Sequence, residues 1–137
     1  MSENPMNEFK KTFTKTYNIQ NKNFLFRSLS TKEVSDIEKE VTKVRFTLNN
    51  EDECFTTRVI ETLARCLVSV DGTQLNKIED VQVDISKGKN ELDSIKAMIG
   101  ELDSSFTTLL YLYYLEMLKE KDSKYQKETE FLNSLNK

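Results

Sequence analysis

The stretch from 106 to 118, FTTLLYLYYLEML, most constrains how this chain can fold. Asp103 or Ser104 is suited to cap a helix here, and apolar residues then occupy every side of that helix. A helix that is apolar all round is stable in water only when other elements cover several of its sides. The rest of the chain must therefore supply helices or strands that pack around it.

Part of this apolar surface is a candidate for binding a partner protein. Tyrosine gives a large contact area and is enriched at interface hot spots. A chain of 137 residues has one modest core, which cannot easily enclose a helix on all sides. The alternative is that this stretch is simply the core of the domain, and both interpretations stay open. The candidate partner-binding residues are Phe106, Leu110, Tyr111, Tyr113, Tyr114 and Met117.

The same helix continues beyond its apolar part. From Glu116 onward the sequence becomes charged, and Glu120 and Lys124 have the i,i+4 spacing that supports a helix. We therefore predict one long helix over residues 104 to 134. Its charged half is typical of a solvated face. The alternative is that it forms an oligomerisation contact.

Two amphipathic helices are predicted upstream. Ser30 and Glu33 have the spacing of a capping box, which begins the first. The second runs from about 52 to 68, with Glu61 opposite its apolar face. Asp71-Gly72 then fits a type I′ turn between two very short strands. The narrow apolar stripe of the first helix consists of Val34, Ile37, Val41, Val44 and Leu48.

The remaining segments give weaker patterns. Residues 9 to 17 and 24 to 26 predict two strands joined by a long polar loop. Residues 81 to 85 alternate, which favours extended chain. A helix over 90 to 100 is expected to end with Gly100 as its C-cap.

These elements predict a mainly α fold of the α+β class. We expect a small helical bundle of four helices with a short N-terminal β-hairpin and a long C-terminal helix. Residues 1 to 7 are predicted to be a disordered tail, and residues 8 to 137 a single domain. Within that domain we expect the hairpin at 8 to 28 and the helical core at 30 to 135.

The composition argues against most catalytic sites. Histidine is absent, which removes Ser-His-Asp and Cys-His nucleophile pairs and any histidine-containing metal site. Cys54 and Cys66 cannot make a four-cysteine zinc site and are typical of small packing residues. The three glycines are too far apart for a phosphate-binding loop. We predict no catalytic residue, no metal and no cofactor.

The charge pattern also limits the partners. The net charge is −3, and acids and lysines are interspersed, so we expect no nucleic-acid partner. A basic patch at Lys10, Lys11 and Lys15 is bordered by Glu8 and is typical of a solvated face. No apolar run could span a membrane, and no signal pattern begins the chain, so we expect a cytoplasmic protein without a membrane partner.

Two segments of the chain resemble a known group of proteins. Residues 26 to 33 read FRSLSTKE, and residues 63 to 75 read LARCLVSVDGTQL. Tail assembly chaperones of tailed bacteriophages, and related small baseplate or hub assembly proteins, often show an FRPLT-x-x-E-like segment and a helix ending in L-x-x-[SC]-[IL]-V-S-[IV]-[DN]-G. The chain departs from this pattern with Ser28 in place of proline and a longer segment at 81 to 89. The residues that match the second motif are Leu63, Cys66, Leu67, Val68, Ser69, Val70, Asp71 and Gly72.

The resemblance, which extends loosely over residues 8 to 135, implies a function by binding. Such a protein would bind other tail or baseplate proteins, such as the tape measure protein, through apolar helix faces, with no enzymatic role. It would act in the host cytoplasm until the tail is built. One alternative is a structural baseplate or hub subunit retained in the virion tail. Another is a bacterial adaptor or regulator that forms a homodimer through the Val34 to Leu48 stripe or the last helix.

Overall fold

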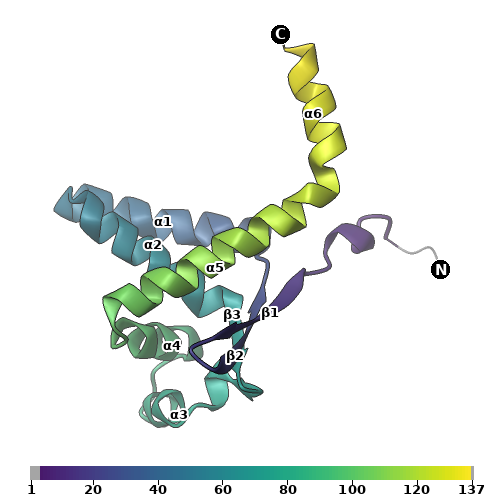
Figure 1. Ribbon diagram of the computed structural model, residues 1–137. Coiled ribbons are helices and arrows are strands. Elements are labelled where there is room, and N and C mark those ends of the chain that lie inside the picture. The colour runs from purple at the N-terminus through teal and green to yellow at the C-terminus, as the bar shows by residue number, and fades with distance from the viewer. Residues whose placement is uncertain (1–3, 137) are drawn as a thin grey trace.

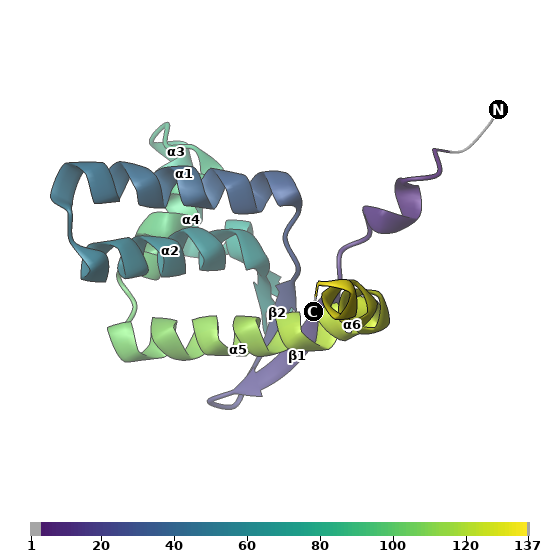
Figure 2. The ribbon, with the colours of Figure 1, turned by 90° about the horizontal axis from the view of Figure 1, so that it is seen from above.

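The computed structural model describes residues 4 to 136 and confirms a mainly α fold with an N-terminal β-hairpin. Figure 1 shows the small sheet at one end of the helical body, while the last helix projects away from it. In Figure 2, helices α1, α2 and α5 lie in successive layers, with α2 between the other two. Residues 1 to 3 of the predicted disordered tail lie outside the described part, so that prediction stays open for them.

The N-terminal hairpin is tighter than predicted. Strands β1 (Thr14–Ile19) and β2 (Lys22–Arg27) pair along their whole length. Only Gln20 and Asn21 connect them, and both have positive φ angles, 53° and 65°. The predicted long loop is wrong, because these two residues adopt the left-handed conformation that a two-residue hairpin turn requires. Phe9 lies in a separate 3₁₀ turn, Asn7–Phe9.

The second predicted hairpin is confirmed and joins the first. Strands β3 (Leu67–Val70) and β4 (Thr73–Gln74) flank Asp71 and Gly72, whose φ angles are 49° and 82°. Because β2 also pairs with β3, the two hairpins form one antiparallel sheet of order β1-β2-β3-β4. The Asp71 N–H donates to the Asn23 carbonyl oxygen at 2.7 Å, which links the two turn regions.

Helix α1 (Thr31–Leu48) begins with the predicted capping box. The Glu33 N–H donates to the Ser30 hydroxyl oxygen at 3.2 Å, and the Ser30 N–H donates to the Glu33 carboxylate at 3.0 Å. Only the middle of the predicted stripe, Ile37 and Val41, is buried. The residues at its two ends, Val34 and Leu48, are exposed.

Helix α2 (Glu51–Cys66) is the centre of the fold. It contacts α1, α4 and α5, and its buried residues include Cys54 and Cys66, both with free thiols. The predicted polar side of α2 is also covered: Glu61 is only 5% exposed. Its carboxylate lies 2.9 Å from both Arg65 and Lys96, so α4 packs there by supplying a cation.

The segment predicted to be extended is instead helix α3 (Glu79–Ser86). Val81 is fully buried, Ile85 is half-buried, and Val83 is exposed. Alternation over five residues also places the first and last residue one helical turn apart, on the same face. Contact with α4 buries that face and favours the helix.

The C-terminal part contains three helices instead of two. Helices α4 (Glu91–Gly100) and α5 (Ser104–Asp122) have the predicted N-caps, Asn90 and Asp103. The predicted single helix to residue 134 is wrong, because a 3₁₀ turn, Ser123–Tyr125, separates α5 from α6 (Gln126–Leu135). Gly100 is the last residue of α4 and not a left-handed cap, since Glu101 follows it with right-handed helical angles.

Candidate protein–protein interface

The inner face of α5 belongs to the hydrophobic core. Leu110 and Met117 are fully buried and Tyr114 nearly so, against the core residues of α2 and the sheet. Burial also raises the pKa of the Tyr114 hydroxyl. Three of the six predicted partner-binding residues therefore have almost no surface to offer in this conformation.

Two more of the predicted residues lie at the boundary between core and surface. The ring centroids of Phe106 and Phe24 are 5.9 Å apart, and those of Tyr113 and Tyr17 are 4.9 Å apart. Both are half-buried and pack against the core from one side. They fix α5 on the sheet and keep part of each ring accessible.

The sixth residue, Tyr111, lies on the opposite edge of α5. Its ring makes an edge-on contact with Phe55 of α2, with 6.0 Å between the centroids. Burial raises the pKa of the Tyr111 hydroxyl above its ordinary value. Phe55 is 46% exposed, so the aromatic pair keeps part of its surface accessible.

Apolar side chains also lie on the outer side of α5, beside the exposed ion pair between Glu116 and Lys119. Leu112 is 54% exposed, and Leu109 and Leu115 lie on either side of it, both half-buried. Among residues 4 to 136, no other helix lies on the side of α5 that faces away from α2 (Figure 2). We call this surface the outer α5 face; it centres on Leu112 and includes the accessible parts of Leu109, Tyr111, Tyr113 and Leu115, which otherwise pack against the core.

Leu112 and Leu115 were not among the partner-binding residues predicted from the sequence. The signal was present, because the helix is apolar all round and the chain is too short to cover every side. What the sequence could not tell is which side would meet α2. That depends on how the sheet and α2 position the helix.

A second uncovered apolar surface lies on α6. Phe131, Leu132 and Leu135 are all exposed, and none of the α6 residues that the structure describes is buried. Figure 1 shows α6 directed away from the helical body. This helix is amphipathic, so its apolar side has the character of a surface that a partner covers.

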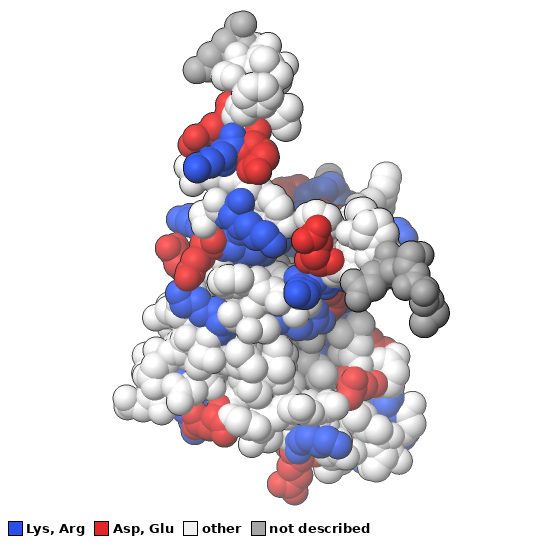
Figure 3. Space-filling view, turned by 90° about the vertical axis from the view of Figure 1, so that its right-hand side faces the viewer, with Lys and Arg blue, Asp and Glu red and all other residues white. Residues whose placement is uncertain are grey.

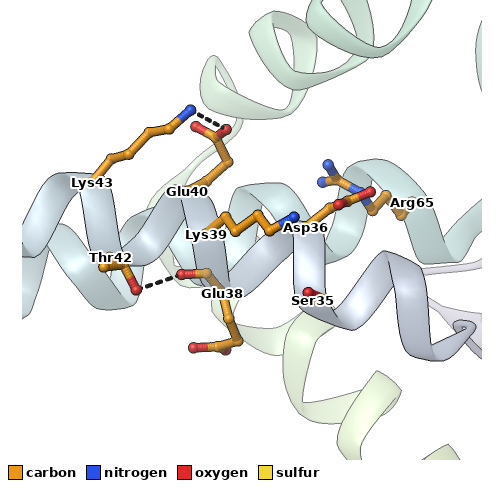
Figure 4. Close-up of a pocket in the computed structure, with 8 residues that line it drawn as sticks. All are labelled: Ser35, Asp36, Glu38, Lys39, Glu40, Thr42, Lys43 and Arg65. Carbon is orange, nitrogen blue, oxygen red and sulfur yellow. Dashed lines mark hydrogen bonds and ion pairs between the residues drawn. The ribbon is translucent and has the colours of Figure 1, made fainter.

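A hollow of about 580 Å³ lies along the polar side of α1 (Figure 4). Lys43 pairs with Glu40 at 3.0 Å, whereas Glu38 points to the other side of the helix and pairs with Arg58 at 2.9 Å. The charges neutralise one another and do not converge on one point. Within the described residues, no three histidine, cysteine or acidic side chains are grouped closely enough to hold a metal ion.

The two segments that carry the resemblance lie side by side in the sheet. Phe26 of the first segment is the register partner of Leu67 in the second, and Leu25 is opposite Ser69. Both segments therefore contribute to one structural unit, where the sheet meets α1 and α2.

No known protein family matches this chain, and neither the curated proteins nor the solved structures give a match.

None of the helices described between residues 4 and 136 is both long enough and apolar enough to cross a bilayer. The outer α5 face combines leucines and tyrosines on a rigid helix that is fixed from behind by the core. Tyrosines are enriched at protein-binding surfaces, and the leucines add apolar contact area.

Proposed function

We propose that this protein is a non-enzymatic assembly factor of a phage tail or baseplate, acting in the host cytoplasm. It binds another tail protein, such as the tape measure protein, through the outer α5 face. The observation that carries the proposal is the exposure of Leu112 between Leu109 and Leu115, on a helix whose other side is core. The resemblance of residues 26 to 33 and 63 to 75 to tail assembly chaperones supports the choice of partner.

The size of this surface favours reversible binding. Complete burial of a leucine contributes about 1.5–3 kcal/mol, and these leucines are already partly buried. Association costs at least about 4 kcal/mol in lost translational and rotational freedom. The gain from three half-covered leucines is of the same order as the lower end of that cost, so this surface alone supports only weak binding. Such a contact suits a factor that shields a partner during assembly and then releases it.

The test is affinity purification of the tagged protein from phage-infected cells, followed by mass spectrometry. We expect wild-type protein to recover a tail or baseplate protein and Leu112→Glu to lose it. Phe46→Glu is the matched control, because Phe46 is 87% exposed on α1, away from α5. Recovery of no tail protein, or equal recovery with both variants, would refute the proposal.

A structural role in the virion is the alternative use of the same surface. A baseplate or hub subunit would bury the outer α5 face permanently. It would be present in purified particles at a fixed ratio to other tail proteins, whereas an assembly factor would be absent. Quantitative mass spectrometry of purified particles distinguishes the two.

A homodimeric bacterial adaptor or regulator is favoured by a different observation. Dimerisation through the α1 stripe would require Ile37 and Val41 to leave α2, since both are buried within the chain. The exposed Phe131, Leu132 and Leu135 of α6 need no such rearrangement. Sedimentation of wild-type protein and Phe131→Glu tests this function: a dimer that the substitution dissociates supports it.

A further inference from the structure

A groove of about 690 Å³ opens between three segments that are far apart in the sequence. Its walls are the N-terminal arm from 9 to 13, the β2–α1 connection from 28 to 32, and residues 120 to 125 at the end of α5. Figure 3 faces this side of the molecule and shows basic side chains gathered below the projecting α6, with a few acidic groups among them. We call this the basic groove.

The residues that line the basic groove carry mainly positive charge. Its lining contains five lysines and one acidic residue, a formal balance of +4, whereas the whole chain carries −3. The single acid, Glu120, already forms an ion pair with Lys15 of β1. The groove therefore concentrates positive charge on an acidic protein. The five lysines are Lys10, Lys11, Lys32, Lys121 and Lys124.

Among the residues that the structure describes, three of these lysines have neither an ion pair nor a cation–π contact, whereas Lys124 lies over the Tyr125 ring, 5.3 Å from its centroid. Within residues 4 to 136, Lys10, Lys11 and Lys32 form no ion pair. All three are exposed on the groove walls. Their ammonium groups are thus available for carboxylates of another chain.

Apolar side chains line the same groove. Phe13 and Leu29 are half-buried in its walls, while Phe9 and Tyr125 are more than two-fifths exposed at its edges. Lysines beside aromatic rings form a surface that fits both a carboxylate and an apolar side chain. A ligand with both kinds of group matches it best.

The arm that forms one wall is held in place by hydrogen bonds. The Phe13 N–H donates to the Ser28 hydroxyl at 2.8 Å, and the Ser28 N–H donates to the Phe13 carbonyl at 2.7 Å. Ser28 is buried, so water does not compete for these bonds. The groove wall is therefore built into the fold at residue 13.

We propose that the basic groove binds an acidic peptide segment of a partner protein. Carboxylates of the segment contact Lys10, Lys11 and Lys124, and one apolar side chain lies between Phe9 and Tyr125. A nucleic acid fits less well, because its affinity comes from many phosphate contacts along an extended basic surface. Here the basic surface is short and belongs to a chain of net charge −3. The groove is separate from the outer α5 face, so it does not depend on the proposed function.

The experiment measures fluorescence anisotropy of a labelled peptide made of aspartate and glutamate with one central phenylalanine. We expect saturable binding to the full-length chain that weakens as salt is raised. The double variant Lys11→Glu, Lys124→Glu should weaken it about tenfold or more, since it places like charges against the peptide. The matched control, Lys77→Glu with Lys87→Glu, makes the same change in net charge at exposed lysines outside the groove.

Three outcomes would overturn the proposal. Equal weakening by both double variants would show that only the overall charge matters. Equal binding of a peptide with asparagine and glutamine in place of the acids would remove the role of the lysines. Tighter binding of a single-stranded oligonucleotide, with loss in the groove variant alone, would make the groove a nucleic-acid site. Circular dichroism of each variant checks that it is folded.

Discussion

Arg27 at the end of β2 and Glu33 in the first turn of α1 form a bidentate ion pair. The two guanidinium nitrogens lie 2.9 and 2.5 Å from the two carboxylate oxygens. The same carboxylate accepts the Ser30 N–H, so Glu33 both caps α1 and fixes the angle between α1 and the sheet. Both residues belong to the segment FRSLSTKE, which explains why this segment needs a basic residue and an acid at that spacing.

The ion pair between Arg27 and Glu33 makes the stability of the fold depend on pH in the acidic range. Hydrogen bonding to Arg27 is the main reason that the pKa of Glu33 falls from 4.5 to about 2. A carboxyl whose folded pKa lies below its unfolded value stabilises the fold above the unfolded pKa, and this contribution is lost as pH falls through the folded pKa. We expect Glu33→Gln to lower the free energy of unfolding at pH 7 and to reduce its decline between pH 4.5 and about 2. Urea denaturation followed by circular dichroism at several pH values measures this.

Glu128→Gln on α6 is the control for that series, because Glu128 is exposed and forms no ion pair among the described residues. A wild-type decline that Glu33→Gln leaves unchanged would contradict the role assigned to the Arg27 pair.

Proline at position 28 should damage this chain, although the resemblance would favour it. Ser28→Pro removes both the N–H and the hydroxyl that bond to Phe13, and we expect a loss of about 2–4 kcal/mol of stability. Ser28→Ala removes only the hydroxyl and should cost about 1 kcal/mol. Limited trypsin digestion at Lys10 and Lys11 should also be faster in the proline variant, since the arm is released. Unchanged digestion would show that the arm is held by other contacts.

The buried carboxylate of Glu61 should be costly to remove alone. Glu61→Ala leaves Arg65 and Lys96 without their shared partner, and we expect destabilisation of about 3 kcal/mol. Replacing all three residues with apolar residues of similar volume should restore most of this loss, because no unpaired charge remains. Chemical denaturation of both variants is the measurement. If the triple variant were as unstable as the single one, the ion cluster would be required for packing itself.

Truncation on the two faces of α5 should cost very different amounts of stability. Leu110→Ala empties a fully buried site and should cost about 2–5 kcal/mol. Leu112→Ala removes a side chain that is 54% exposed and should cost less than about 1 kcal/mol. Thermal and urea unfolding of the two variants compares the same substitution two residues apart. Equal losses would mean that the outer α5 face is not free.

Local rules determined much of this fold. The capping box at Ser30, the Asp71-Gly72 turn and the N-caps Asn90 and Asp103 were predictable, because each depends on a few neighbouring residues. Tertiary contacts decided the rest. Alternation in residues 81 to 85 fits a strand and a short helix equally well, and packing against α4 selected the helix.

The break between α5 and α6 was not predictable in the same way. No proline or glycine occurs there. Past Met117 the helix has no further buried residue to hold it straight, and the Ser123 hydroxyl donates to the Glu120 carbonyl at 2.7 Å. Such side-chain bonding to the preceding turn bends helices. For the candidate interface, the excess of apolar residues on α5 was visible in the sequence, while the face left uncovered was not.

The pairing of β2 with β3 has a consequence for the order of folding. Residues 26 and 67 are separated by the whole α1–α2 hairpin, so closing the sheet first would cost the entropy of a long loop. Formation of the helical hairpin, whose turn holds Asn49 at a φ of 48°, brings the two strands together beforehand. We expect stopped-flow refolding to show helix signal before protection of sheet amides, and Asn49→Val to slow both. We therefore expect the α1–α2 hairpin to be the early nucleus and the sheet to form last.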